Sequence, residues 1–371
     1  MNIHYLAMAN VPSGSANSIQ IVKMCEAFRS NGHNIKLILP NLIPQNNLNS
    51  DYYNVKNKFY IKKIGKKIKS IKGVFNFIIP LFLVIESLKD KNNELIITRN
   101  IIVSLILIIT RKKHVLELHD DIATAGKFSS LIFKLFNLLN SKYIYRIIFI
   151  TNSLKIYISK KYNYSNNNYK ILPDATEVYN FNIKKNYKKY FNIGYFGSFY
   201  SSRGVDIILK LSETDKKNKY FIYGGNKDES AKIKRKIRNK NLFINPRVPY
   251  KDVKSFLCKM DILLMPYKNK VTIGGDFGDT SKFMSPLKMF DYLGASKIIL
   301  ASELEVLKEI LKDKYNCIFI KNFNNVNSWR NEINKINTDS VKSTILRKNA
   351  LKTALIYNWK NRARDMVCEN I

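Results

Sequence analysis

Three polar side chains stand at helical spacing in residues 281–294, which read SKFMSPLKMFDYLG. Ser285 followed by Pro286 is a helix start signal, and the apolar residues after it recur with a helical period. The first-turn N–H groups of this helix, the Ser285 hydroxyl and Lys288 would together bind an anion. Asp291 follows one turn later on the same side, where its carboxylate can accept hydrogen bonds from vicinal hydroxyls. The pattern suits a nucleoside diphosphate, and an amphipathic helix with a solvated lysine and aspartate is the alternative.

A second cation follows a glycine loop further up the chain. Residues 191–195 predict a strand, after which the loop Gly197 to Arg203 leads into a helix that ends near Leu211. Such loops lie at the carboxyl edge of a parallel sheet, where α/β folds bind ligands. Arg203 would grip a phosphate with two hydrogen bonds. The alternative is an isolated surface arginine.

The first loop of the chain is rich in small residues. It reads NVPSGSA and joins a strand predicted at residues 2–9 to a helix predicted at residues 19–30. Small residues such as Gly14 let the backbone approach a substrate. Asn17 and Ser18 follow the loop and are candidates to contact a ligand. A pure helix-capping role for one of them is equally consistent with the sequence.

A histidine follows another buried strand. Residues 115–118 predict the strand, and His119, Asp120 and Asp121 come directly after it. A histidine at the carboxyl end of a strand is well placed to touch a reacting sugar or phosphate. The two aspartates either orient it or cap the helix predicted at residues 129–139.

The run SPLKMFDYLGASKIILASELEVLKEIL resembles the donor site of the group 1 family of retaining glycosyltransferases with GT-B fold. In that family a Ser-Pro-x-Lys and an acidic residue on one helix hold the nucleotide sugar. The family's second glutamate corresponds to Asp291, and its first glutamate falls on Phe283. The resemblance therefore implies that Ser285, Pro286, Leu287, Lys288 and Asp291 bind the donor.

Other parts of the chain carry the same resemblance. TNSLK at residues 151–155 is similar to the family's T-x-S-x-x-K, and PDATE at residues 173–177 to its Pro-Asn-Gly-Val-Asp. Arg203-Gly204 corresponds to the second of two basic residues that grip the diphosphate, and Ser198 replaces the first. The family also has a histidine near the donor sugar at the position of His119.

The resemblance implies an α/β protein of GT-B fold, with two Rossmann-like doubly wound domains facing a central cleft. The acceptor-side domain would span residues 1–178, with the C-terminal helix 356–371 packed back on it. The donor-binding domain would span residues 190–355, after a polar linker at residues 179–189. A helix over residues 303–311, a mobile loop over residues 268–282 and two last helices, at residues 326–336 and 340–359, are also expected.

The implied reaction is transfer of a sugar, with retention, from a nucleotide-diphosphate sugar to a glycan acceptor. Arg203, Lys288 and the helix start would stabilise the leaving diphosphate, with His119 as a third catalytic residue. Gly14 and Ser198 would lie near the donor, and Asn17, Ser18 and Asp120 on the acceptor side. The resemblance also implies that the enzyme needs no metal and no cofactor. The four cysteines and four histidines show no metal-ligand spacing.

The composition bounds the partners. A formal charge of +35 over 371 residues suits nucleic acid, an anionic membrane surface or anionic substrates, and AT-rich codon usage would also produce it. Residues 51–72 form a basic amphipathic stretch before an apolar run at residues 74–85. The stretch predicts a membrane-surface contact, a solvated face or a polyanion site. No apolar run reaches the roughly 20 residues of a membrane span.

Several functions follow from these observations. We expect a glycosyltransferase of bacterial surface polysaccharide synthesis (capsule, lipopolysaccharide or a lipid-linked glycan), in the cytoplasm or peripheral on the inner face of the plasma membrane. Phe283 and Ser198 leave open an inactive GT-B protein that serves as a binding or scaffold subunit. The helix-start phosphate site argues against a nucleic-acid partner, and no paired acid and base supports a nucleotide-sugar epimerase.

Overall fold

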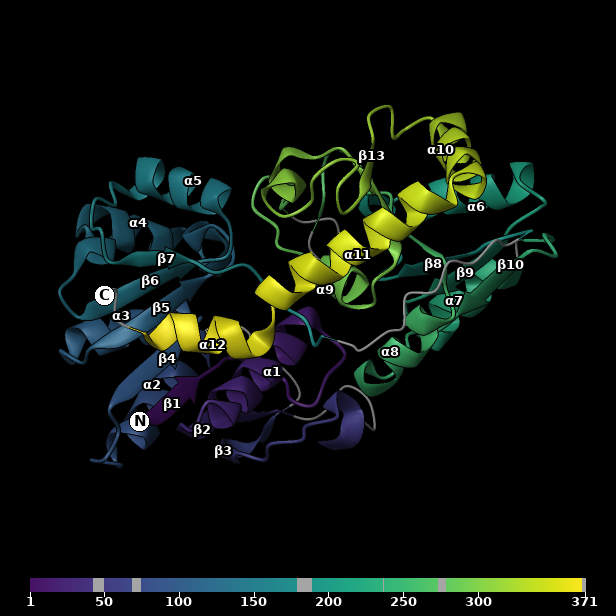
Figure 1. The fold of residues 1–371 in the computed structure, drawn as a ribbon. Helices are drawn as coiled ribbons and strands as arrows, with labels where there is room; N and C mark the ends of the chain where they lie inside the picture. The colour runs from purple at the N-terminus through teal and green to yellow at the C-terminus, as the bar shows by residue number, and fades with distance from the viewer. Residues whose placement is uncertain (43–49, 69–74, 179–188, 236, 273–277, 369–371) are drawn as a thin grey trace. The chain divides into compact units, whose positions relative to one another are not determined.

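The computed structural model forms two compact α/β units (Figure 1). Unit 1 comprises residues 1–174 and 359–371, and unit 2 comprises residues 175–358. The predicted linker lies outside the described residues except for Lys189. The structure describes residues 1–42, 50–68, 75–178, 189–235, 237–272 and 278–368.

Unit 1 is built on a seven-stranded parallel sheet of order β3-β2-β1-β4-β5-β6-β7. Its central strands are rich in Ile, Leu and Val and are buried on both faces, as parallel strands covered by helices must be. The strands are β1 (Asn2–Leu6), β2 (Asn34–Leu42), β3 (Tyr60–Ile68), β4 (Leu95–Thr98), β5 (His114–Leu118), β6 (Ile144–Phe149) and β7 (Tyr169–Ile171).

The helices of unit 1 cover both faces of this sheet. Right-handed crossovers place α1 on one face and α2, α3, α4 and α5 on the other, because the strand order reverses at β1. Figure 1 shows α12 beside α1, and the side chain of Asn31 donates to the Lys360 carbonyl at 2.9 Å. The helices are α1 (Ala16–Ser30), α2 (Phe75–Leu88), α3 (Ile101–Ile109), α4 (Lys127–Leu135), α5 (Asn152–Tyr162) and α12 (Trp359–Val367), with 3-10 turns η1 (Ser50–Tyr53), η2 (Ile122–Ala125) and η3 (Leu138–Asn140).

Unit 2 repeats the plan with a six-stranded parallel sheet of order β10-β9-β8-β11-β12-β13. Two apolar clusters fill its two faces, one around Tyr292 and one around Trp329. The strands are β8 (Asn192–Phe196), β9 (Lys219–Tyr223), β10 (Leu242–Asn245), β11 (Ile262–Met265), β12 (Ile298–Ser302) and β13 (Ile318–Ile320). The helices are α6 (Val205–Thr214), α7 (Lys227–Arg235), α8 (Tyr250–Cys258), α9 (Leu287–Gly294), α10 (Val326–Thr338) and α11 (Ser340–Ile356), with 3-10 turns η4 (Ser201–Arg203) and η5 (Glu305–Glu309).

The strand order shows at which point of each sheet a ligand is expected to bind. In unit 1 it reverses between β1 and β4, and in unit 2 between β8 and β11. The loops after these strands open a crevice at the carboxyl edge of a doubly wound sheet. The predicted loops after residue 9 and after Gly197 therefore both lie at such a switch point, as do the residues after β4 and β11.

Three predicted elements are wrong in detail. Helix α1 begins at Ala16 and Ser15 is its cap, because the Ser15 hydroxyl accepts from the Ser18 N–H at 3.2 Å; neither Asn17 nor Ser18 is the cap. The helix predicted at residues 303–311 is the short 3-10 turn η5. The helix predicted at residues 340–359 ends at Ile356, where the Tyr357 carbonyl accepts from the Thr176 N–H at 3.1 Å.

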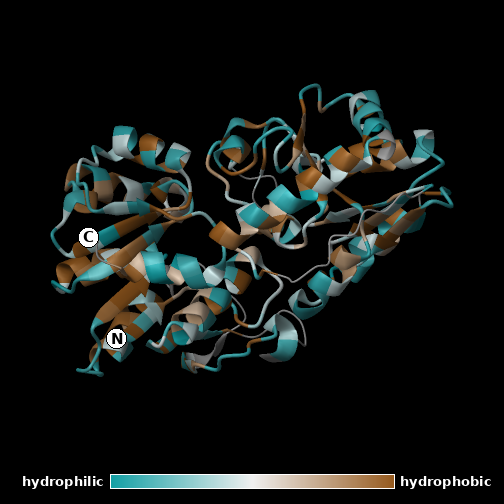
Figure 2. Cartoon of the chain, in the orientation of Figure 1, coloured by the Kyte–Doolittle hydropathy of each residue, from teal (hydrophilic) through white to brown (hydrophobic). Residues whose placement is uncertain are grey.

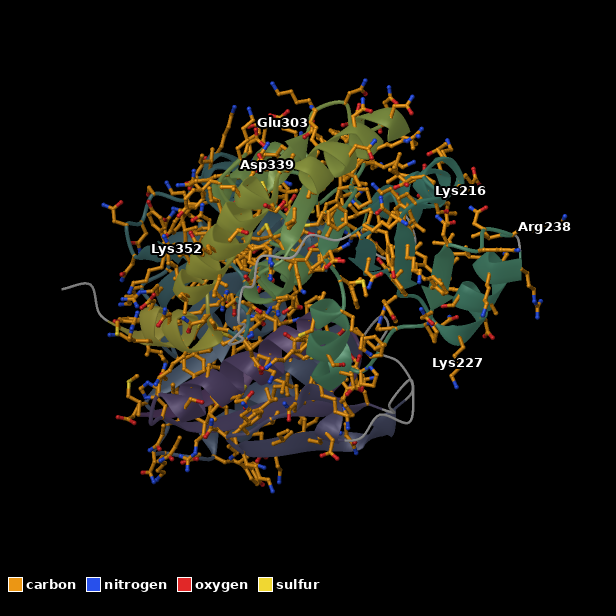
Figure 3. The ribbon with its side chains drawn as sticks, turned by 45° about the vertical axis from the view of Figure 1, so that its right-hand side comes forward. Lys216, Lys227, Arg238, Glu303, Asp339 and Lys352 are labelled. Atoms are coloured by element: carbon orange, nitrogen blue, oxygen red, sulfur yellow. The ribbon has the colours of Figure 1, made fainter. Side chains whose placement is uncertain are left out.

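Basic side chains cover the exterior of unit 2. Figure 3 shows Lys216, Lys227, Arg238 and Lys352 projecting from the ribbon, and all four are exposed. Helix α7 carries a basic run, with Lys232, Lys234 and Arg235 also exposed, and this run is a solvated face.

Candidate functional site

Unit 2 brings Arg203 and Lys288 onto one aromatic ring. The Arg203 guanidinium lies 5.4 Å from the centroid of the Tyr267 ring, and the Lys288 Nζ lies 4.8 Å from the same centroid. Lys288 also lies 4.3 Å from the Tyr195 ring centroid. The two predicted phosphate-binding cations are therefore close neighbours, although they are 85 positions apart in the sequence.

Two glycines make this approach possible. A Cβ on Gly197 would stand 2.8 Å from the Lys288 Nζ, so the ammonium group lies directly over the glycine loop. Gly204 has a φ of +69° and caps η4, and a Cβ there would stand 1.6 Å from the Pro266 carbonyl oxygen. Gly204 thus lets the loop that carries Arg203 pack against the chain that follows β11.

Neither cation has an acidic partner among the residues that the structure describes. Among the described residues, the Lys288 ammonium has no hydrogen-bond acceptor and contacts the two tyrosine rings instead. Burial first, and then the charge of Arg203, lower the pKa of Lys288 well below its ordinary value. One Arg203 nitrogen donates to the Thr272 carbonyl at 3.1 Å, and within the described part of the chain its buried Nε has no partner. A bound anion would compensate the positive charge of both side chains.

The helix after this pair begins one residue later than predicted. Pro286 is the cap residue of α9, with ψ of 121°, and not its first helical residue. The cap residue Pro286 makes no side-chain hydrogen bond to the N–H groups of the first turn. Ser285 and Leu287 are buried at this end, and Lys288 stands in the first turn, where a cation opposes the helix dipole unless an anion is present.

Asp291 is held inside unit 2. Its Oδ1 accepts hydrogen bonds from the Thr176 hydroxyl at 3.1 Å and from the Tyr250 hydroxyl at 3.2 Å. The side chain is buried and lies one turn beyond Lys288. Phe283, which replaces the family's first glutamate, is also buried. Ser198 lies in the loop next to Gly197, and its carbonyl accepts from the Tyr195 hydroxyl at 2.8 Å.

Unit 1 has a cavity of about 260 Å³ at the carboxyl edge of its sheet. Asn17, His119 and Asp120, all predicted from the sequence, line it. Arg99 lines it too, directly after β4, and it was not predicted. Ser18 does not line the cavity, because its buried hydroxyl bonds to the Tyr53 hydroxyl.

The loop of Gly14 is fixed by the same tyrosine. The Tyr53 hydroxyl accepts from the Ser13 N–H at 2.6 Å and donates to the Ser13 carbonyl at 2.9 Å. Gly14 follows directly and does not line the cavity. The structure thus brings together Asn17, His119 and Asp120, and leaves Ser18 and Gly14 beside them.

Glu117, and neither aspartate, orients His119. The His119 Nε2 lies 2.8 Å from the Glu117 Oε1, so Nε2 carries the proton because the carboxylate can only accept. Burial and the charge of Arg99 lower the pKa of His119 to about 4 despite Glu117. The imidazole is therefore neutral at pH 7, with Nδ1 free of a proton and able to accept from a hydroxyl. Asp121 instead caps η2, and its carboxylate bonds to Tyr162 at 2.6 Å.

Glu117 is the centre of a buried network that the sequence did not reveal. It accepts from Arg362 at 2.6 Å, from Gln20 at 2.9 Å and from Tyr5 at 3.1 Å. Burial alone would raise the pKa of Glu117, but Arg362 and His119 hold it well below its ordinary value. The only available signal was a glutamate inside an otherwise apolar strand, HVLEL.

The C-terminal helix supports this network. Arg362 of α12 is buried and also donates to the carbonyls of Leu172 at 2.9 Å and Pro173 at 2.7 Å. Burial and the charge of Glu117 raise the pKa of the neighbouring Asp174 to about 6, despite Arg362. The last helix of the chain therefore fixes the residue that orients His119.

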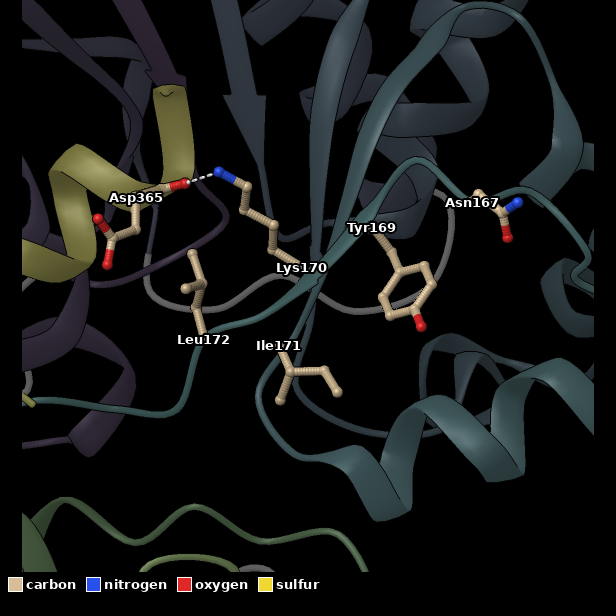
Figure 4. Close-up of a pocket in the computed structure, with 6 residues that line it drawn as sticks. All are labelled: Asn167, Tyr169, Lys170, Ile171, Leu172 and Asp365. Atoms are coloured by element: carbon tan, nitrogen blue, oxygen red, sulfur yellow. Dashed lines mark hydrogen bonds between the residues drawn. The ribbon is translucent and has the colours of Figure 1, made fainter. Parts of the chain in front are cut away.

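A second hollow of unit 1 is bounded on one side by the C-terminal helix α12. It measures about 580 Å³ and is lined by Asn167, Tyr169, Lys170, Ile171, Leu172 and Asp365 (Figure 4). The Lys170 ammonium donates to the carbonyls of Asp365 and Cys368, at 2.8 Å each, at the end of α12. This lysine therefore caps the carboxyl end of α12.

No protein-family model matches the sequence, and no curated protein matches it. Solved structures match over nearly the whole chain. Sucrose-phosphate synthase from Thermosynechococcus elongatus gives a TM-score of 0.73 at 12% identity, over 98% of this chain and 97% of that one. The Anabaena protein HepE in complex with UDP and glucose gives 0.68 at 12% identity, over 98% and 97%.

A third match is WaaG, a glycosyltransferase involved in lipopolysaccharide biosynthesis, with a TM-score of 0.63 at 13% identity over 99% of this chain and all of that one. The two parallel Rossmann-like sheets define a protein of GT-B fold. More particularly, several of the structures that it resembles are glycosyltransferases, and the likeness confirms the GT-B fold predicted from the sequence.

Proposed function

We propose that the protein is a retaining glycosyltransferase that takes its sugar from a nucleotide-diphosphate sugar. The observation that carries the proposal is the Arg203–Lys288 pair, which lies over the glycine loop of a GT-B fold without an acidic partner among the described residues. A nucleoside diphosphate supplies the missing negative charge. HepE in complex with UDP-glucose, a solved relative by fold, supports a nucleotide-sugar ligand.

Each unit 2 residue has a role in this proposal. Arg203 and Lys288 neutralise the charge that develops on the leaving diphosphate, which is usually the largest electrostatic contribution to catalysis. The N–H groups at the start of α9, next to Ser285, Pro286 and Leu287, add hydrogen bonds to the same phosphates. Ser198 and Gly197 belong to the loop that contacts the donor. Asp291 binds the ribose hydroxyls, since a carboxylate accepts several hydrogen bonds.

The unit 1 cavity supplies the groups for the sugar and the acceptor. His119, neutral and held by Glu117, accepts a hydrogen bond from a donor-sugar hydroxyl at Nδ1. Asn17 and Asp120 line the same cavity and bind acceptor hydroxyls. Ser18 and Gly14 support the loop that approaches the substrates. An oxygen of the leaving phosphate takes the acceptor proton, so no metal and no protein base enter the step.

The acceptor is a glycan of bacterial surface polysaccharide synthesis (capsule, lipopolysaccharide or a lipid-linked glycan), and the enzyme works in the cytoplasm at the inner face of the plasma membrane. The net charge of +35 favours an acceptor at an anionic surface. WaaG, one of the structures it is similar to, is involved in lipopolysaccharide biosynthesis.

A thermal-shift screen with UDP, GDP, CMP and ADP tests the donor site. One nucleoside diphosphate should raise the melting temperature of the wild type and leave that of Arg203→Met unchanged. A panel of donor sugars then separates an enzyme from an inactive scaffold, which would bind the nucleotide without hydrolysis or transfer. Failure of every nucleotide to bind would refute the proposed donor site.

A further inference from the structure

Helix α2 is apolar on both of its faces. Its inner side chains Leu83 and Val84 are fully buried in a cluster that includes Leu6 and Ile38. An ordinary surface helix turns a polar face to solvent, yet Figure 2 shows α2 as largely hydrophobic. The outer side chains, which we name the α2 stripe, are Phe77 (47% exposed), Ile78 (41%), Leu81 (44%), Phe82 (55%) and Ile85 (43%).

The spacing makes the stripe continuous. Its members recur at i, i+1, i+4, i+5 and i+8, which places them along one side of a helix. Contiguous exposed apolar side chains of this size mark a surface that binds a partner or a membrane. Helix α3, which packs against α2, ends at Ile109, and this side chain is 69% exposed.

Lysines border the α2 stripe. Lys36 of β2 lies 6.0 Å from the ring of Tyr60 on β3, and that ring is 58% exposed. Burial would raise the pKa of Glu86 on α2, yet Lys89, Lys62 and Lys36 lower it, so these lysines lie close to the helix.

An apolar helix face with aromatic side chains and a basic border matches the chemistry of an anionic bilayer surface. No described helix has the length and apolarity to cross a membrane, and α2 has 14 residues with Pro80 inside it. A helix of this kind lies in the interface, with its apolar side chains below the headgroups and its lysines among the phosphates.

We propose that the α2 stripe docks unit 1 on an anionic phospholipid bilayer. The inference rests on the surface of unit 1 and is independent of the nucleotide site of unit 2. It deepens the proposed location, since it names the segment that makes the contact. A second copy of the chain, or a protein partner, is the competing occupant of the same face.

Vesicle sedimentation tests the docking. The full-length wild type should bind vesicles of phosphatidylglycerol and phosphatidylcholine at least tenfold more tightly than vesicles of phosphatidylcholine alone. The double variant Leu81→Gln/Phe82→Gln should lose at least tenfold in binding to the anionic vesicles. The control is Ile156→Gln on α5, an isoleucine of unit 1 outside the α2 stripe with 57% exposure, which should bind like the wild type.

A fluorescent variant locates the contact. The two natural tryptophans, Trp329 and Trp359, are buried, so Phe82→Trp adds an exposed reporter whose emission should shift to the blue on anionic vesicles. Binding without this shift would place the contact elsewhere and overturn the proposal. Loss of a dimer in light scattering for the double variant, with vesicle binding unchanged, would assign the stripe to a second copy. Nucleotide thermal shifts of the same variants should equal those of the wild type.

Discussion

Lys288→Met should make the ligand-free protein more stable and its nucleotide binding weaker. Lys288 and Arg203 each lie about 5 Å from the centroid of the Tyr267 ring, so their charges are at most about 10 Å apart. At an effective dielectric constant of about 20, two like charges at that distance repel by at least ~1.7 kcal/mol. Methionine keeps much of the side-chain volume and removes both this repulsion and the burial of the ammonium group.

The expected gain for the ligand-free protein is about 1–3 kcal/mol, which corresponds to a rise of roughly 3–8 °C in the melting temperature. The nucleotide loses charge-assisted hydrogen bonds, each worth about 1.5–3 kcal/mol, so its dissociation constant should rise roughly 10- to 100-fold. Differential scanning calorimetry measures the first effect and isothermal titration calorimetry with UDP, GDP and ADP the second. Lys352→Met removes an exposed charge of unit 2 and is the matched control.

The pH dependence has a defined sign. Because burial and Arg203 lower the pKa of Lys288, its protonated form destabilises the fold, and this penalty grows as the pH falls below about 10.5 toward the folded-state pKa. A bound diphosphate raises that pKa, so nucleotide binding should take up protons in the wild type and fewer in Lys288→Met. Titration at one pH in two buffers of different ionisation enthalpy measures the uptake. A Lys288→Met protein that melts lower without ligand and binds nucleotide unchanged would refute the reasoning.

Four further outcomes follow from the structure. Burial lowers the pKa of His114 to about 4, so the folded state favours the neutral imidazole. The free energy of unfolding should therefore fall by about 3 kcal/mol as the pH falls from 6.5 to 4. The urea midpoints at pH 7 and pH 4.5 should differ less in His114→Gln than in the wild type. Gly204→Ala should destabilise the protein by more than about 2 kcal/mol, because the added Cβ would lie 1.6 Å from a carbonyl oxygen. Gly32 also has a positive φ but lies in open space, so Gly32→Ala should cost only about 1 kcal/mol. Urea titration measures both changes. Arg362→Met leaves a buried carboxylate unpaired and should cost about 3–5 kcal/mol by denaturant unfolding. Asp291→Asn should abolish the preference for a nucleoside diphosphate over its 2′-deoxy form in titration calorimetry, and an unchanged preference would exclude the ribose contact.

Sequence patterns located the cations of unit 2 because each follows a recognisable local signal. Arg203 stands in a glycine loop between a strand and a helix, and Lys288 follows Ser-Pro at a helix start. In doubly wound sheets such positions converge on the carboxyl edge, and both side chains do meet there, at Tyr267. Tyr267 itself was beyond prediction, because ring contacts depend on the packing of β11 and not on any motif.

Other features depend on contacts distant in sequence. Glu117 orients His119 only because Arg362, 245 positions later, returns in α12 to neutralise the buried carboxylate. Asp120 and Asp121 were predicted for that role because they follow His119 in the sequence. In the structure, Glu117 makes the hydrogen bond to His119 instead. The sequence also shows that α2 is hydrophobic on all sides. It does not show which face of the helix remains exposed after folding. Residues 273–277, within the mobile loop predicted over residues 268–282, lie outside the described residues, so the mobility of that loop stays a prediction.

The contrast between Arg362 and Lys288 separates folding from function within one chain. A cation removed from water destabilises a fold unless a carboxylate or hydrogen-bond acceptors compensate it. Unit 1 satisfies this requirement for Arg362 with Glu117 at 2.6 Å and two backbone carbonyls. Lys288 is enclosed by two tyrosine rings and Gly197 instead, with no acceptor among the described residues. Folding alone gives no reason to retain a lysine there, whereas a phosphate ligand provides the missing counter-charge and makes the same lysine favourable.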